Sequence, residues 1–66
     1  MFYEIRNLLI NLAEIQYIEL ITNKKTNTYI IAVHFIYKME LLYFDSYSEL
    51  IDEYNMLKQK LQEFFG

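Results

Sequence analysis

The first thirteen residues carry their apolar side chains at helical spacing. The apolar positions recur at i, i+3, i+4 and i+7, at Ile5, Leu8, Leu9 and Leu12. Asn7 and Asn11 fall on the opposite side. This period is typical of a helix with one buried face. We therefore expect a helix over about residues 2–13.

The next segment, Ile15 to Thr22, is rich in β-branched and aromatic residues and alternates between two faces. This alternation predicts a strand over about residues 15–22. The polar cluster Asn23-Lys24-Lys25-Thr26-Asn27 follows, and asparagine favours the backbone conformations of tight turns. We interpret this cluster as a hairpin loop that leads into a second strand.

Residues 28–37 form the strongest strand pattern in the chain, because apolar side chains occupy both faces. A strand of this kind is expected at the centre of a sheet. A third strand is expected at about residues 41–44. Because Lys38-Met39-Glu40 contains no glycine, proline or asparagine, a single bent strand is the alternative at this boundary.

A final helix is predicted at about residues 47–65, where Ser46-Tyr47-Ser48-Glu49 matches a capping box. Acidic side chains lie near its start and lysines nearer its end, as the helix dipole favours. The resulting order is α-β-β-β-α in a single domain, residues 1–66. Short connections favour a three-stranded antiparallel sheet with two helices packed on one face, so the expected fold class is α+β.

The last helix carries aromatic and leucine residues at heptad spacing. These residues are Tyr47, Leu50, Tyr54, Leu57, Leu61 and Phe64. One interpretation is a self-association seam of the coiled-coil type. The other is that the stripe packs on the protein's own sheet. We favour the second interpretation, because stable coiled coils usually extend over three or more heptads.

The tyrosines indicate a second candidate surface. A partner-binding face is predicted at Tyr17, Tyr29, Val33, Phe35, Tyr37 and Tyr43. It is open if the helices cover the other face, made of Ile18, Leu20, Ile30, Ala32, Ile36, Leu42 and Phe44. Amphipathic rings are common at protein interfaces because they tolerate partial burial and keep a polar hydroxyl. The competing interpretation is that these rings form a second side of the core.

Size and composition favour self-association. The 66-residue chain has no cysteine and a single histidine, which excludes disulfides and cages built from cysteine or several histidines. Hydrophobic residues make up 55% of the sequence and supply apolar surface beyond the needs of a small core. We therefore expect a homodimer or higher homo-oligomer.

The residues that enzymes use for chemistry are scarce. His34 lies in mid-strand among apolar neighbours, and Ser46 is already engaged as a helix cap. The only glycine is Gly66, so a glycine-rich phosphate loop is excluded. The carboxylates of the last helix lie on a solvated surface. We expect no enzymatic activity, no cofactor and no metal site.

Charge and hydropathy exclude further classes. No apolar run is long enough to span a membrane, and the first residues lack the features of a signal peptide, so we expect a cytoplasmic protein. The net charge of −3 disfavours nucleic acid as a partner, because binding to phosphates depends on positive charge.

The expected element order is similar to that of the double-stranded-RNA-binding domain, over the whole chain but in topology only. That family has a lysine cluster at the start of its last helix, where this chain reads Asp45-Ser46-Tyr47-Ser48-Glu49. An acidic helix start would repel the duplex, so no RNA-binding residue is carried over. The alternative function is a nucleic-acid-associated regulator that uses the region of Lys24, Lys25 and Lys38.

The leading hypothesis is a small non-enzymatic protein-binding module that self-associates. The short chain, free of proline and cysteine and rich in isoleucine, tyrosine and asparagine, is also similar to small accessory proteins of phages and other mobile elements. Such proteins commonly occlude a host protein. This resemblance implies an inhibitor or adaptor that binds a protein partner.

Overall fold

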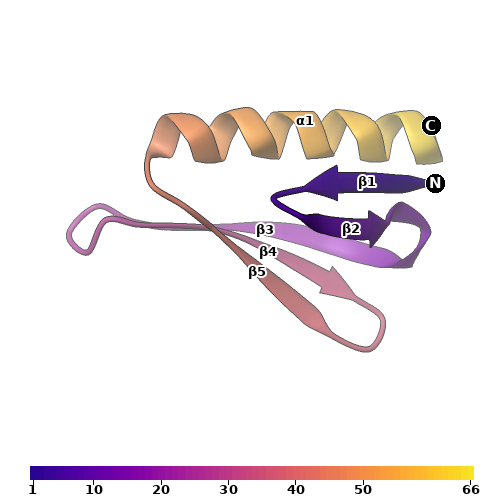
Figure 1. Ribbon diagram of the computed structural model, residues 1–66, viewed down its shortest axis with the longest axis horizontal. Helices are drawn as coiled ribbons and strands as arrows, with labels where there is room; N and C mark the ends of the chain where they lie inside the picture. Colours follow the sequence, from indigo (N-terminus) through magenta and orange to yellow (C-terminus); the bar gives the residue numbers. More distant parts are fainter.

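Two antiparallel sheets and one long helix make up the computed structural model, which describes residues 1–66. The elements are β1 (Phe2–Ile5), β2 (Leu8–Asn11), a 3-10 turn (Leu12–Glu14), β3 (Ile15–Asn23), β4 (Thr28–Phe35), β5 (Met39–Phe44) and α1 (Tyr47–Phe65). Strands β1 and β2 form a hairpin, and β3, β4 and β5 form a sheet with β4 at its centre. Figure 1 shows α1 running along one side of this sheet with the hairpin beside it.

The amino-terminal segment is a β-hairpin, so the prediction of a helix over residues 2–13 is wrong. Arg6 and Asn7 connect the two strands with φ angles of 49° and 67°. Positive φ at both central residues is the signature of a type I′ turn, whose twist matches that of the flanking strands. Ile5 and Leu8 are paired across this turn. The fold is therefore α+β with one helix, and the expected α-β-β-β-α order does not form.

The apolar spacing of this segment fits a hairpin as well as it fits a helix. Beyond the turn, Leu8, Ile10 and Leu12 recur every second residue and point toward the core. Leu9, which the helical pattern placed on the buried side, is 66% exposed. The period of two therefore describes the segment. The helical spacing arose by chance, because two four-residue strands joined by a two-residue turn place apolar residues at similar intervals.

The three-stranded antiparallel sheet is confirmed, with boundaries close to those predicted. A turn separates β4 from β5, where the Phe35 amide donates to the Lys38 carbonyl at 2.8 Å, so the bent-strand alternative is wrong. The polar cluster before β4 is the expected hairpin loop. Its first side chain, Asn23, accepts from the Lys25 amide at 3.0 Å, and Asn27 has a φ of 51°.

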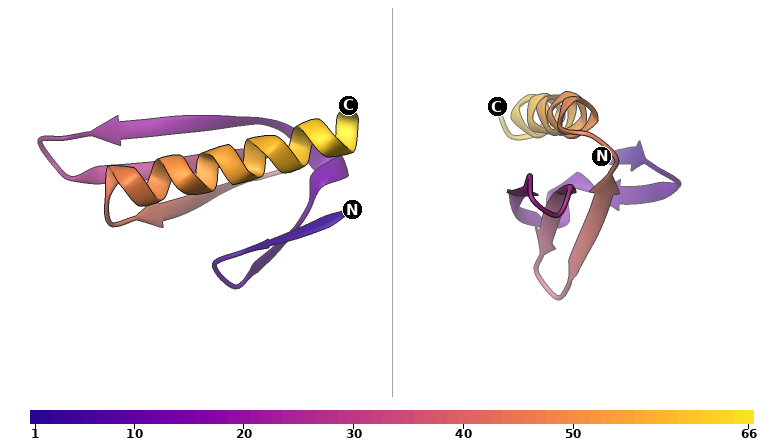
Figure 2. Two further views of the ribbon diagram at one scale, coloured as in Figure 1. Left: turned by 90° about the horizontal axis from the view of Figure 1, so that it is seen from above. Right: turned by 90° about the vertical axis from the view of Figure 1, so that its left-hand side faces the viewer.

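The hydrophobic core lies between α1, the hairpin and one face of the sheet. Its fully buried side chains include Ile31 and Val33 of β4 and Leu50 and Leu57 of α1. The helix begins as predicted, because the Ser46 hydroxyl accepts from the Glu49 amide at 3.2 Å and satisfies an unpaired donor of the first turn. Figure 2 shows that α1 and the hairpin lie on the same side of the sheet.

Polar and aromatic contacts attach the hairpin to the junction between β5 and α1. The Arg6 guanidinium lies 4.2 Å from the centre of the Phe44 ring and 3.8 Å from the Glu49 carboxylate. On β1, the Tyr3 hydroxyl donates a long hydrogen bond of 3.5 Å to Glu53 of α1. Burial raises the pKa of Tyr3 above its usual value, and the negative charge and hydrogen bond of Glu53 raise it further.

Substitutions at Asn7 distinguish the hairpin from a helix. Asn7→Gly should keep or raise the free energy of unfolding, because glycine adopts positive φ without strain. Asn7→Val should lower it by about 1–2 kcal/mol, since left-handed backbone is costly for a side chain with a Cβ. A helix would give the reverse order, because glycine is the poorer helix former. Urea denaturation followed by circular dichroism measures both variants.

Tyr3 should make the stability of the fold sensitive to alkaline pH. Because its pKa is higher in the folded than in the unfolded chain, its contribution is complete below about pH 10. The contribution is lost as the pH rises through the folded-state value. Tyr3→Phe should therefore lose less stability than the wild type between pH 9 and about pH 11. The matched control is Tyr37→Phe at a solvent-exposed turn, which should keep the wild-type loss.

Candidate binding surface

The face of the three-stranded sheet that points away from α1 is formed by three rows of cross-strand neighbours. The rows are Tyr17–His34–Met39, Glu19–Ala32–Leu41 and Ile21–Ile30–Tyr43. We call these nine residues the open face. The right view of Figure 2 shows α1 and the hairpin on the other side of the sheet.

The open face is apolar although it is in contact with solvent. Five of its large side chains are exposed to between 38% and 62%: Tyr17, Ile21, Met39, Leu41 and Tyr43. In the middle strand, Ala32 is fully buried and Ile30 is 9% exposed. Because no second layer of the protein covers them, these two residues are shielded by the neighbouring side chains of β3 and β5. The result is a continuous apolar surface.

Glu19 is the only residue of the open face with a formal charge at pH 7, and His34 is its hydrogen-bond partner. The His34 Nε2 atom lies 3.0 Å from the Glu19 Oε1 atom. The His34 ring also stacks on the Tyr17 ring, with centroids 4.0 Å apart and planes at 14°. The imidazole is thus held by a carboxylate and an aromatic ring, which is the arrangement of a histidine in a packing role.

The six residues predicted as one binding face are divided between both sides of the sheet. Val33 and Phe35 are buried in the core, and Tyr29 packs against it. Tyr17 and Tyr43 lie on the open face. Tyr37 lies in the turn after β4 and is 96% exposed. The expectation that all six share one face is therefore wrong.

A register difference of one residue explains this division. The predicted covered face combined the side chains of β4 that point to the open face with those of β3 and β5 that point to the core. Ile31 of β4 is paired with Leu20 and Leu42, so these three residues share the core side. A β-bulge between Ile15 and Tyr17 also interrupts the alternation of β3. A shift of one residue moves a whole strand's side chains to the opposite face.

The heptad stripe of α1 packs on the protein's own sheet, as the favoured interpretation expected. Leu50 and Leu57 are completely buried. Tyr54, Leu61 and Phe64 pack against the same core. The stripe is therefore not available as the alternative self-association seam. Only its first residue, Tyr47, is largely exposed. Its ring lies edge-on to that of Tyr29, with the ring centroids 6.4 Å apart.

The structure does not bring the three lysines of the alternative function together. Lys24 and Lys25 lie in the loop before β4, whereas Lys38 lies in the turn after it. The eight residues of β4 separate these loops by about 25 Å. The chain contains no group of three His, Cys, Asp or Glu side chains that could hold a metal ion. No helix is both long enough and apolar enough to cross a membrane.

Comparison with known proteins adds no assignment to this geometry. No family model matches the chain, and neither a curated protein nor a solved structure is found to be similar to it. The open face therefore has to be interpreted from its own residues.

A helix substitution tests the burial of the heptad stripe. Leu57→Ala should lower the free energy of unfolding by about 2–5 kcal/mol, because it removes a fully buried side chain from the core. Met56→Ala is the matched control on the same helix turn, where the side chain is 47% exposed and the cost should stay near 0.5 kcal/mol. Equal effects of the two substitutions in urea denaturation would contradict the packing of α1 described above.

Proposed function

We propose that this protein is a non-enzymatic protein-binding module that self-associates through the open face. One observation carries the proposal: nine neighbouring side chains on a solvent-facing sheet include a single charged residue and five exposed large apolar ones. Depletion of charge and enrichment in tyrosine and methionine distinguish the centre of protein interfaces from ordinary surface.

The size of the open face supports a second copy of the chain as its occupant. Its five exposed large side chains have surfaces of about 150–250 Å² each and are exposed to between 38% and 62%. Together they expose on the order of 500 Å² of surface. This is near the upper end for the largest apolar patch of a monomer, about 300–600 Å². Two such faces would bury on the order of 1,000 Å², which is about the lower limit for a specific interface.

The arrangement of charge on the open face is compatible with this pairing. Glu19 belongs to the edge strand β3, so it lies at the margin of the face, where interfaces tolerate polar groups. Its carboxylate already has a partner in His34 at 3.0 Å. A second copy would therefore cover the apolar centre while this carboxylate stays at the margin with a hydrogen-bond partner, which avoids the cost of several kcal/mol for a buried isolated charge.

Self-association would also give the small fold a second core. A domain of this size buries a limited share of its surface, and the chain contains no disulfide to compensate. Sheet-to-sheet packing would place Ile30 and Ala32 between two protein layers. The apolar side chains around them, which are exposed in the monomer, would be buried in the dimer and would stabilise it.

A charge placed on the open face tests the proposal. The wild type should have twice the mass of the chain in sedimentation or light scattering at tens of micromolar. Leu41→Asp, in the middle row, should increase the dissociation constant at least ~30-fold, because a buried unpaired carboxylate costs about 2 kcal/mol or more.

Leu9→Asp provides the matched control, since it alters an exposed leucine of another edge strand, away from the open face. This variant should remain dimeric. Circular dichroism of both variants should match that of the wild type, which checks that they are folded. A monomeric wild type, or a Leu41→Asp variant that stays as dimeric as the control, would overturn self-association through this face.

A further inference from the structure

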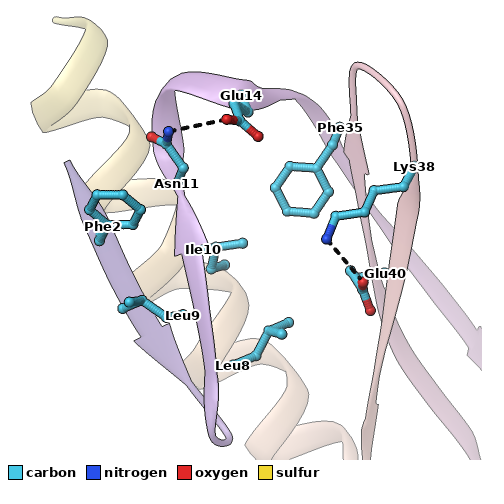
Figure 3. A pocket seen from close by; sticks show the side chains of 9 residues that line it. All are labelled: Phe2, Leu8, Leu9, Ile10, Asn11, Glu14, Phe35, Lys38 and Glu40. Carbon is cyan, nitrogen blue, oxygen red and sulfur yellow. Dashed lines mark hydrogen bonds and ion pairs between the residues drawn. The ribbon is translucent and has the colours of Figure 1, made fainter.

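A second candidate site lies on the covered side of the sheet, between β2 and the turn that joins β4 to β5. It is a cavity of about 270 Å³, shown in Figure 3. The side chains around it are Phe2, Leu8, Leu9, Ile10, Asn11, Glu14, Phe35, Lys38 and Glu40. In Figure 3 the β2 side chains approach it from one wall, and Phe35, Lys38 and Glu40 approach it from the other.

Two unpaired strand edges flank this cavity. Strand β2 pairs only with β1, and β5 pairs only with β4, so each has one free edge. The two edges do not pair with each other. A strand added to the free edge of β5 would lie beside the cavity that β2 lines on its other wall.

The free edge of β5 presents backbone groups that could hold such a strand. The Phe35 amide donates to the Lys38 carbonyl, so Lys38 directs its backbone toward β4. Because backbone groups alternate along an antiparallel strand, those of Met39, Leu41 and Tyr43 point to the free edge. No proline interrupts β5, and no other strand pairs with this edge. An unpaired edge of this kind is a template for strand addition.

The side chains of the cavity define the chemistry of the added strand. Leu8, Ile10 and Phe35 provide an apolar lining suited to an aliphatic side chain. The volume lies just below the range of about 300–1,000 Å³ that small-molecule sites occupy, so a few side chains of a peptide fit it better than a nucleotide-sized ligand.

The charged side chains of the cavity favour a basic segment. Lys38 is paired with Glu40 at 3.5 Å and lies 5.4 Å from the centre of the Phe35 ring. Glu14 accepts from the Asn11 side chain at 3.3 Å and has no cationic partner in the structure. The cavity thus has one carboxylate in excess, and a lysine or arginine two positions from the aliphatic residue, on the same face of the added strand, would complement it.

We infer that this cavity binds an extended, basic peptide segment of another protein, added as a strand along the free edge of β5. Backbone hydrogen bonds to β5 supply the attachment, the apolar lining accepts an aliphatic side chain, and Glu14 selects a basic residue two positions away on the same face of the strand. The site is separate from the open face, because Phe35 and Glu40 point to the opposite side of the sheet. A self-associated protein would therefore keep it accessible.

Three synthetic hexapeptides test this inference by nuclear magnetic resonance on the full chain. The first is Ser-Val-Ser-Lys-Ser-Val, in which the valines and the lysine share one face of an extended strand. The second replaces the lysine by glutamate, and the third is the first peptide with N-methyl groups on all its residues. The first peptide should shift the amide signals of Leu8–Asn11 and Met39–Phe44 and slow the hydrogen exchange of Met39, Leu41 and Tyr43. The glutamate peptide should bind at least 10-fold more weakly, and the N-methylated peptide should not bind, because it lacks the strand-forming donors.

A charge reversal on the protein tests the selectivity. Glu14→Lys should remove the preference for the basic peptide, since the excess carboxylate is then replaced by a cation. Asp52→Lys is the matched control on an exposed position of α1, outside this cavity, and should keep the preference. Signals that do not move at β2 and β5, or equal binding of the N-methylated peptide, would overturn strand addition at this site.

Repeating the titration with Leu41→Asp separates this inference from the proposed self-association. The substitution alters a side chain of the open face and leaves the β5 backbone in place, so the basic peptide should still bind. A dimer that fails to form while the peptide binds would remove only the proposed function. A stable dimer that binds no peptide would remove only the strand-addition site.

Discussion

The apolar character of both faces of β4 is the constraint on which the rest of the structure depends. The only elements of this 66-residue chain that can cover the faces of β4 are one helix and one hairpin, and both lie on the same side of the sheet. Ile31 and Val33 are completely buried on that side. On the other side, Ile30 and Ala32 are shielded only by neighbouring strands. The exposed apolar residues of the open face follow from this unequal coverage.

Local signals allowed much of the fold to be predicted from the sequence. Alternation identified the three strands of the larger sheet, asparagines identified the loop before β4, and Ser46 identified the start of α1. Each signal depends on a few neighbouring residues and on backbone geometry. The faces that adjacent strands share cannot be predicted from such local signals, because β4 is apolar on both faces and either face could have been the covered one. The bulge in β3 added a phase shift that alternation does not reveal.

The hairpin could not be predicted for a related reason. Strands of four residues contain too few positions to distinguish a period of two from a helical period. The turn residues, Arg6 and Asn7, lack the glycine that usually marks a type I′ turn. Contacts distant in sequence, between Arg6 and both Phe44 and Glu49, hold the hairpin at the end of α1. The cavity beside β2 depends on this placement, so it could not be predicted either.

Strand β5 links the two candidate surfaces through different parts of its covalent structure. The side chains of Met39, Leu41 and Tyr43 lie on the open face, whereas the backbone groups of the same residues point to the free edge. Side chains and backbone hydrogen bonds of a strand are oriented at right angles, so the two surfaces do not compete for the same atoms. A dimer formed by the open faces would carry two free β5 edges. A partner with two basic segments could then bind both, and its second attachment would be intramolecular, which increases its apparent affinity without any new kind of contact.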